Sequence, residues 1–346
     1  MNENICPLCD QSETTFFAET RDHLLNTTKK VFSLRECLSC EIVFISPMPS
    51  VSELRTYYPS GYWWSESDHA EGFLPTLGKR LESLYRRIAL QDHVRFVMKS
   101  IRHVAAAGES VKLLDVGCSG GTLLHELARR GFPGRGLDSS EEAVAHAREA
   151  YQLDCRVGEL TQSPWPDENF SLVTCFHVLE HVPDPKTFLK AARVVLTEQG
   201  RVVVQVPNIR SWQFRLFGDH WYGLDPPRHL VNFSDRALSR VLQEAGFQVV
   251  RQKRFSIRDD PAAWVSSLFP ALDPLARTVR RKAELNGAPQ SSALGIFQNF
   301  VYFLLWLIAI PVALCDSLSG RGATIMIDAR RSPEPSDHNS ERQSNS

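Results

Sequence analysis

Short apolar runs alternate with amphipathic segments through the middle of this 346-residue chain. From residue 112 onward, each run is followed by a segment whose apolar residues recur at helical spacing. This alternation predicts an α/β fold, with a mostly parallel sheet and helices on both of its faces. The expected strands are residues 112–116, 134–138, 153–157, 170–176, 200–206, 247–255 and 323–328, and the expected helices are residues 121–130, 140–151, 186–196 and 234–245.

Two regions precede this pattern. Residues 30–36 and 41–45 alternate apolar and polar side chains, as strands do, and residues 74–107 carry apolar residues at helical spacing. The expected organisation follows from these boundaries. It comprises an N-terminal module at 1–64, a helical lead-in at 65–107, a central domain at 108–330 with an insertion at 257–322, and a disordered polar tail at 331–346.

The insertion contains the most apolar stretch of the chain, residues 296–315. Its length suits a transmembrane helix, but if residues 323–330 return to the sheet, both ends must lie on the same side of a membrane. We therefore favour a re-entrant or interface-lying hairpin, bent at Pro311. The second alternative is an oligomer interface or a lid, and the third is a helix that spans the membrane. A basic group that precedes the stretch suits anionic lipid headgroups: Arg277, Arg280, Arg281 and Lys282.

Composition narrows the class of protein. The chain is 43% hydrophobic and 23% charged, as ordinary globular proteins are. Its net charge of −1 disfavours a dedicated nucleic-acid binder. The first ten residues are polar, so we expect no secretory signal and a cytoplasmic protein, peripheral or monotopic at the inner face of the membrane where the apolar stretch meets lipid.

Four of the eight cysteines form two C-x-x-C pairs, Cys6 with Cys9 and Cys37 with Cys40. Each pair places two thiolates on one tight turn, and two such turns complete a tetrahedral zinc site. A closed set of four ligands leaves no open position for chemistry, so the zinc is expected to be structural. The alternatives are four unrelated free cysteines or a redox pair, and neither pair precedes a helix as redox pairs do. The module is therefore expected to resemble a zinc ribbon, with a long hairpin between the pairs.

Residues 112–124, K-L-L-D-V-G-C-S-G-G-T-L-L, join the first expected strand to its helix through a glycine-rich turn. Glycines let a ligand approach the backbone, and the start of the helix offers N–H groups. Asp138 follows about twenty residues later at a strand end, where an acid accepts hydrogen bonds from ribose hydroxyls. A dinucleotide would require G-x-G-x-x-G, whereas residues 117–122 read G-C-S-G-G-T. S-adenosylmethionine (SAM) needs no phosphate cradle and is the alternative ligand.

With these motifs, the chain resembles the class I SAM-dependent methyltransferases, which have a Rossmann-like fold with a seven-stranded, mostly parallel sheet. Residues 115–121 look like the D-x-G-x-G-x-G motif of that family, with Ser119 in place of a glycine. Residues 176–185 are similar to the V-L-E-H-V-x-D-P element of the small-molecule branch, which includes quinone-ring O-methyltransferases. The cysteine pairs and residues 227–230, P-R-H-L, resemble a subgroup of bacterial zinc-knuckle methyltransferases. Ser171 departs from the family, which usually has an acid at the start of strand four.

The resemblance carries expectations for the fold and the cofactor site. The last strand should insert antiparallel beside strand six. Residues 158–160 fall where the family contacts adenine. The residues expected to contact SAM are Asp115, Gly117, Cys118, Gly121, Asp138, Glu159, Leu160 and Phe176.

Candidate catalytic residues follow strands four and five. His177, Glu180 and His181 would share one face if their segment is helical, and His229 lies after strand five. Three roles are open for this set: a histidine general base that takes a proton from an acceptor hydroxyl, a second, divalent cation held as in family members with an E-x-x-E-H…H set, or hydrogen bonds that order the loop. Arg228, beside His229, could hold an anionic substrate.

The aromatic cluster at residues 57–64, Y-Y-P-S-G-Y-W-W, is expected to pack at the domain junction, with a substrate pocket as the alternative. The leading function is a SAM-dependent methyltransferase that acts, preferably at oxygen, on a small molecule or a lipid- or sugar-linked acceptor. An RNA methyltransferase with the zinc module as reader is second, weakened by the near-neutral charge. A non-catalytic SAM-binding scaffold is third. The sequence does not predict the acceptor or the oligomeric state.

Overall fold

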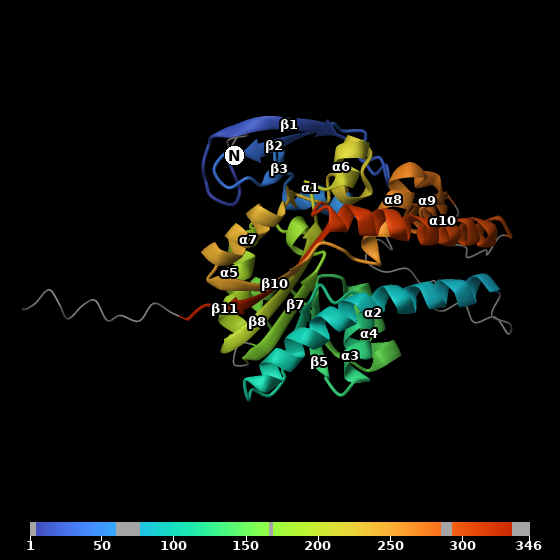
Figure 1. Cartoon of the computed structure of the whole chain (residues 1–346). Coiled ribbons are helices and arrows are strands. Elements are labelled where there is room, and N and C mark those ends of the chain that lie inside the picture. The colour runs from blue at the N-terminus through green and yellow to red at the C-terminus, as the bar shows by residue number, and fades with distance from the viewer. Residues whose placement is uncertain (1–4, 60–76, 166–168, 285–292, 334–346) are drawn as a thin grey trace, which may run out of the picture.

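A computed structural model describes residues 5–59, 77–165, 169–284 and 293–333 of the chain (Figure 1). The later part of the aromatic cluster, residues 60–64, and most of the tail, residues 334–346, lie outside the described residues. The described chain folds into a large sheet between two layers of helices, with a smaller sheet above it (Figure 1).

The large sheet has seven strands in the order β10-β11-β8-β7-β4-β5-β6. Neighbouring strands from β8 to β6 are parallel, whereas β11 runs antiparallel to both β8 and β10. The predicted α/β fold with a mostly parallel, seven-stranded sheet is therefore confirmed. The strands are β4 (Leu113–Val116), β5 (Gly134–Asp138), β6 (Asp154–Val157), β7 (Phe170–Phe176), β8 (Leu196–Pro207), β10 (Phe247–Lys253) and β11 (Thr324–Arg331).

Helices cover both faces of this sheet because its strands bury alternate side chains on opposite sides. Leu113 packs among the buried side chains of α2, α3 and α4, whereas Leu114 packs on the other face with α5 and α7. Burying such a side chain contributes about 1.5–3 kcal/mol relative to exposure. The lead-in forms one long helix, α2. The helices are α2 (Leu77–Ala106), α3 (Thr122–Ala128), α4 (Glu141–Tyr151), α5 (Pro185–Val195) and α7 (Asp235–Glu244).

The N-terminal module forms a four-stranded antiparallel sheet in the order β1-β2-β3-β9. Its first two strands, β1 and β2, form the hairpin expected between the cysteine pairs, and β2 and β3 are the strands expected on either side of the second pair. The fourth strand, β9, comes from the loop after β8, so a later part of the chain completes this sheet. The elements are β1 (Thr14–Thr20), β2 (Phe32–Cys37), β3 (Val43–Ser46), α1 (Val51–Thr56) and β9 (Val231–Asn232).

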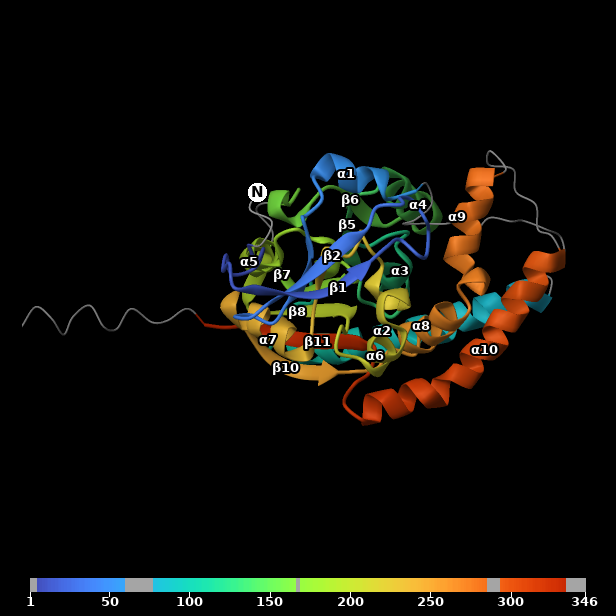
Figure 2. The ribbon, with the colours of Figure 1, turned by 90° about the horizontal axis from the view of Figure 1, so that it is seen from above.

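The insertion forms three helices at the periphery of the molecule, and a short helix, α6, precedes it in the loop after β8 (Figure 2). The expected hairpin at Pro311 is wrong, because α10 continues as one helix through that residue and does not turn back on itself. Both ends of the insertion return to the sheet, since β11 pairs with β10. The helices are α6 (Trp212–Phe217), α8 (Asp259–Leu268), α9 (Pro274–Glu284) and α10 (Ala293–Leu318).

Candidate active site

The turn between β4 and α3 has a left-handed backbone at three positions. Gly117 has φ +73° and Gly121 has φ +80°. A Cβ on Gly117 would lie 2.3 Å from Cγ2 of Val178, so only glycine fits there. Ser119 has φ +48°, which costs a non-glycine residue about 1–2 kcal/mol. Its N–H donates to Oδ2 of Asp138 at 2.8 Å, and this bond helps to hold the turn.

Two buried carboxylates end neighbouring strands beside this turn. Asp138 also accepts from the N–H of Ser140 at 2.9 Å, and burial raises the pKa of Asp138 against these hydrogen bonds. A carboxylate has about four acceptor sites, and the backbone N–H groups of Ser119, Ser139 and Ser140 use three of them, so a ribose hydroxyl could use the fourth. Asp115 accepts from Oγ1 of Thr174 at 2.6 Å, and burial raises its pKa to about 7. Both lie at the C-terminal edge of the parallel strands, where open α/β sheets bind ligands.

The other residues expected at the SAM site differ in exposure. Cys118 and Leu160 are buried, whereas Glu159 is exposed at the start of a short 3-10 turn. Phe176 is half-buried, and its ring centroid lies 4.7 Å from that of His93 on α2. These side chains follow the ends of β4, β6 and β7, so the fold brings them to one sheet edge.

Ser171, which stands where the family has an acid, has a structural partner. Its Oγ accepts from the N–H of Lys112 at 2.9 Å and lies 3.3 Å from the Lys112 carbonyl oxygen. The hydroxyl therefore joins the start of β7 to the residue before β4.

Glu180, His181 and His229 gather beyond β7 and could hold a metal ion, with one ligand atom of each within 4.8 Å of the others. The His181 and His229 rings lie edge to face with centroids 4.6 Å apart. Glu180 is 1% exposed, and its Oε2 has no hydrogen-bond partner. Burial would raise the pKa of Glu180, but the histidines His177, His229 and His181 outweigh it and lower the pKa. A buried carboxylate oxygen without a partner is costly unless a cation or donor meets it.

The two histidines of this set share a hydrogen-bonding arrangement. Nδ1 of His181 lies 3.0 Å from the carbonyl oxygen of Arg228, and Nδ1 of His229 lies 3.0 Å from that of Gly223. A carbonyl accepts only from an N–H, so Nδ1 carries the proton in both rings and Nε2 is the basic nitrogen. Burial, together with His229, lowers the pKa of His181 to about 4, which keeps the ring neutral. Imidazoles whose Nδ1–H is held by a backbone carbonyl in this way can present Nε2 to a metal.

The segment that carries His177, Glu180 and His181 is not one helix, so the condition for a shared helical face is not met, although His177 still contacts Glu180. The 3-10 turn covers only Leu179–His181, and His177 itself has φ +55°. Its Nδ1 lies 3.1 Å from Oε1 of Glu180, and its Nε2 lies 3.4 Å from Oδ2 of Asp259 on α8. Burial alone would lower the pKa of His177, but the Asp259 and Glu180 carboxylates outweigh it and raise the pKa to about 10. A histidine that keeps its proton at neutral pH is a poor general base.

The network around His177 contains residues that the sequence patterns did not indicate. The Gln205 side-chain nitrogen lies 2.7 Å from Oδ2 of Asp259, and Ser256 Oγ donates to the same oxygen at 2.6 Å. His93 is buried, with its Nε2 3.5 Å from that oxygen. Asp259 lies in the insertion, outside every motif, so only the fold brings it to β7.

Arg228 does not hold an anionic substrate as expected, because it is fully buried between two carboxylates. Its guanidinium donates to both oxygens of Asp22 at 2.8 and 3.0 Å and to both oxygens of Asp225 at 2.6 to 3.0 Å. It also donates to the carbonyl oxygen of Tyr57 at 3.1 Å. These partners saturate the guanidinium and leave it no surface for a ligand.

The N-terminal module reaches the candidate site directly. The hydroxyl of Tyr58 lies 3.1 Å from Nδ1 of His181. Leu230 donates its N–H to the Glu180 carbonyl at 2.8 Å and accepts from the N–H of Ile45 in β3 at 3.0 Å. Tyr57 is buried and packs edge-on against Phe32. The described part of the aromatic cluster thus supplies one packing residue and one site residue.

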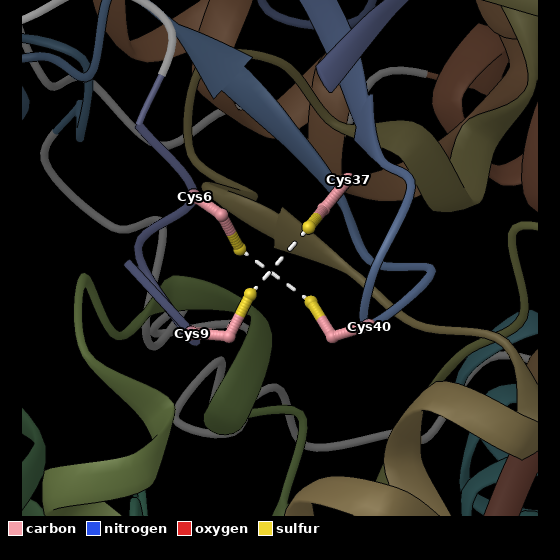
Figure 3. Close-up of side chains that lie close together, drawn as sticks. All are labelled: Cys6, Cys9, Cys37 and Cys40. Carbon is pink, nitrogen blue, oxygen red and sulfur yellow. Dashed lines mark hydrogen bonds between the residues drawn. The ribbon is translucent and has the colours of Figure 1, made fainter. Parts of the chain in front are cut away.

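The four cysteines of the two pairs converge on one point, as Figure 3 shows. The sulfur atoms of Cys6 and Cys40 lie 3.5 Å apart, as do those of Cys9 and Cys37. Four thiolates around zinc at about 2.3 Å define a tetrahedron with edges of about 3.8 Å, so the set fits a zinc ion. The residue after each pair has a left-handed backbone, Asp10 at φ 58° and Glu41 at φ 62°, so the two turns match.

Comparison with known proteins shows similarity over part of the chain. Residues 85–252, just under half of the chain, match a family model described as a methyltransferase domain. This region contains strands β4 to β8 and most of β10. The chain is similar to a ubiquinone biosynthesis O-methyltransferase from Pseudomonas aeruginosa (strain LESB58), with 36% identity over 151 residues, 40% of this chain and 65% of that protein. A protein of the same name from Idiomarina loihiensis is 37% identical over 110 residues, 29% of this chain and 45% of its own length.

The chain thus spans between 45% and 65% of the length of these two curated relatives. Among solved structures, magnesium protoporphyrin IX methyltransferase from Synechocystis PCC 6803 overlaps with a TM-score of 0.46 and 14% identity, covering 82% of this chain and 100% of the other. The geranyl diphosphate C-methyltransferase of Streptomyces coelicolor A3(2) also gives 0.46, at 14% identity over 77% of this chain and 89% of its own. Both TM-scores are below 0.5, so the fold is assigned from the strand order of the large sheet.

Proposed function

We propose that the protein transfers a methyl group from SAM to a hydroxyl oxygen of a small or lipid-linked acceptor. The observation that carries this proposal is the position of two polar sets at one sheet edge. Asp115 and Asp138 end β4 and β5, and Glu180, His181 and His229 lie beyond β7 and β8. The curated relatives are O-methyltransferases, which supports oxygen as the acceptor atom.

The chain's own residues would bind and orient the reactants. SAM supplies the methyl group on a positively charged sulfur. Asp138 would accept hydrogen bonds from its ribose, and the left-handed turn at Gly117 and Gly121 would let the cofactor approach the backbone. Alignment of donor and acceptor supplies most of the rate enhancement in such a displacement, so rigid placement by these strand ends is the main contribution of the protein.

We further propose that Glu180, His181 and His229 hold a divalent cation next to the acceptor. Two imidazoles and one carboxylate are a common ligand set for divalent metals and leave positions open for a substrate. The unpartnered Oε2 of Glu180 supports a cation over a set that only orders the loop. A bound cation would act there as a Lewis acid that makes an acceptor hydroxyl easier to deprotonate. The zinc held by the four cysteines is, in this proposal, separate and structural.

Calorimetric titration with SAM tests the cofactor proposal. The Asp138→Ala variant should bind SAM at least about tenfold more weakly, because hydrogen bonds to a charged group contribute about 1.5–3 kcal/mol. Asp154→Ala, an exposed acid on β6, is the matched control and should bind normally. If the purified protein binds no SAM, the result would favour a non-catalytic scaffold over an enzyme. RNA binding with a steep salt dependence would point instead to an RNA acceptor.

The acceptor and the cation need a second experiment. Purified protein with labelled SAM is incubated with small phenols and with extracted membrane lipids, and methylated products are identified by mass spectrometry. Glu180→Gln should lose most activity and should no longer respond to added Mg²⁺ or Mn²⁺. Full activity after chelation that leaves one zinc per chain would refute the cation at this site and leave the methyl-transfer proposal intact.

A further inference from the structure

Helix α10 has two faces of opposite character. Its inner face is buried against α8 and α2 at Tyr302, Trp306 and Ala313. The Tyr302 hydroxyl lies 3.1 Å from Oγ of Ser266, and Asp316 accepts from Nε1 of Trp264 at 2.8 Å. Asp316 is the single charged residue between positions 297 and 318, and it faces the protein. Tyr302 and Asp316 therefore both tie this face of the helix to α8.

The outer face of α10 is apolar along its length and exposed. Positions three or four residues apart line it, from Phe297 at 62% exposure to Ile308 at 66%. The stretch from 297 to 318 has a mean hydropathy of 2.1, and only 22% of its most apolar window is buried. Monomeric soluble proteins rarely expose an apolar surface of this extent without a partner. The residues of this outer face are Phe297, Phe300, Leu304, Leu307, Ile308 and Val312.

The C-terminal end of this surface carries an exposed tryptophan flanked by arginines. The Trp212 ring lies 5.0 Å from the guanidinium carbon of Arg321 and 5.3 Å from that of Arg215. Its Nε1 donates to Oγ of Ser319 at 2.8 Å, which fixes the indole beside the end of α10. Leu216 is exposed next to it. Tryptophan with arginine at the edge of an apolar surface is the arrangement that proteins place at the lipid headgroup level.

We propose that α10 lies in the plane of a lipid bilayer, with its outer face among the acyl chains and Trp212, Arg215 and Arg321 at anionic headgroups. The charges favour lipid over a second copy of the chain. Arg321 is the only exposed charged side chain of residues 294–324 that the structure describes, and a second copy would have to bring an acid to it that this segment lacks. Lipid phosphates supply that negative charge directly.

The structure also selects an in-plane helix over a spanning one. The inner face of α10 is packed against the globular domain, so it cannot be surrounded by lipid. Before it, α9 is held through Ala276 and Val279 against Leu25 of the N-terminal module. After it, β11 enters the central sheet. Both ends are therefore fixed on one side of the bilayer, as in monotopic proteins.

Vesicle flotation of the full chain tests the proposal without depending on methyl transfer. The protein should float with vesicles of phosphatidylcholine and phosphatidylglycerol. The double variant Leu307→Glu with Ile308→Glu should reduce binding by at least about tenfold, because it places two charges among acyl chains. Val194→Glu, at an exposed valine on α5, is the matched control and should float as the unmodified protein does. Arg215→Gln and Arg321→Gln should each weaken binding about fivefold to vesicles that contain phosphatidylglycerol, and should not change binding to vesicles of phosphatidylcholine alone.

A second measurement distinguishes loss of lipid contact from misfolding of a variant. Brominated lipids should quench the fluorescence of the unmodified protein, and Trp212→Phe should remove part of that quenching. No flotation of the unmodified protein, or equal flotation of the double variant with a normal circular dichroism spectrum, would overturn the proposal. A dimer in sedimentation that the double variant breaks, with no flotation at all, would also overturn it and assign the surface to a second copy.

Discussion

Asp22 and Arg228 form a two-pronged ion pair between residues 206 positions apart in the chain, and both side chains are fully buried. Arg228 immediately precedes His229, whose ring contributes to the candidate cation site. The pair therefore fixes the loop after β8 to the N-terminal module. Through it, the module becomes part of the scaffold of the active site.

Breaking this pair should unfold or strongly destabilise the protein. Arg228→Ala leaves the Asp22 and Asp225 carboxylates buried without the cation that neutralises them, which costs about 3–5 kcal/mol. Urea denaturation measures the loss. Arg236→Ala removes an arginine that pairs with Glu41 at the surface, and it should cost about 0–1 kcal/mol. Equal stability of the two variants would contradict the structural role given to Arg228.

Acid should weaken the same contact. Burial would raise the pKa of Asp22, but Arg228 and Thr27 outweigh it and lower the pKa. A carboxyl with a depressed pKa contributes stability above its unfolded pKa of about 3.9 and loses it as the pH falls through the folded value. Denaturation midpoints below pH 4 should therefore fall less steeply in Asp22→Asn than in the unmodified protein. Parallel curves for the two proteins would show that Asp22 does not drive acid sensitivity.

Removal of zinc should affect both stability and catalysis. The turn that carries Cys37 and Cys40 leads into β3. In β3, the N–H of Ile45 is hydrogen-bonded to Leu230, and the N–H of Leu230 is hydrogen-bonded to the carbonyl of Glu180. Cys37→Ser should lower the zinc content to below one ion per chain, lower the melting temperature and reduce methyl transfer. Cys315→Ser, at an exposed cysteine on α10, is the control and should change neither zinc content nor activity. Unchanged activity without zinc would show that the module is not coupled to the site.

The glycine turn can be tested with two alanines. Gly117→Ala and Gly131→Ala both place a side chain at a left-handed position, at φ +73° and +86°. A Cβ at Gly131 meets no atom within 4 Å, whereas one at Gly117 meets Val178 at 2.3 Å. Both should lose about 1–2 kcal/mol of stability from backbone strain. Only Gly117→Ala should also lose SAM affinity, as measured by calorimetry, and equal affinities would argue against this turn as the cofactor seat.

His177 should titrate far above an ordinary histidine. The Asp259 and Glu180 carboxylates outweigh burial and hold its pKa near 10, so its contribution to stability is full below the unfolded pKa of about 6.5 and lost as pH rises through about 10. Asp259→Asn should lower that midpoint, as measured by the NMR shifts of the imidazole carbons. Asp273→Asn, another buried acid of the insertion, should leave it unchanged. A midpoint near 6.5 in the unmodified protein would remove the role given to Asp259.

Local chemistry explains which parts of this structure the sequence could predict. Strands β5 and β7 begin and end at the predicted residues, because a glycine and an acid bound one and apolar residues fill the other. The cysteine pairs were equally clear, since the ligand spacing itself encodes the turn. The partnership of His177 with Asp259 was not predictable, because it depends on how the insertion packs against β7. The predicted grouping of His177 with Glu180 and His181 assumed a helix, and the left-handed backbone of His177 is incompatible with one.

Strand β11 imposes an order on biosynthesis. It pairs with β8 on one side and β10 on the other, so β10 cannot join the sheet in its final position until β11 lies between them. The ribosome releases α10 before it releases β11. The apolar helix is therefore outside the ribosome while the sheet is still incomplete.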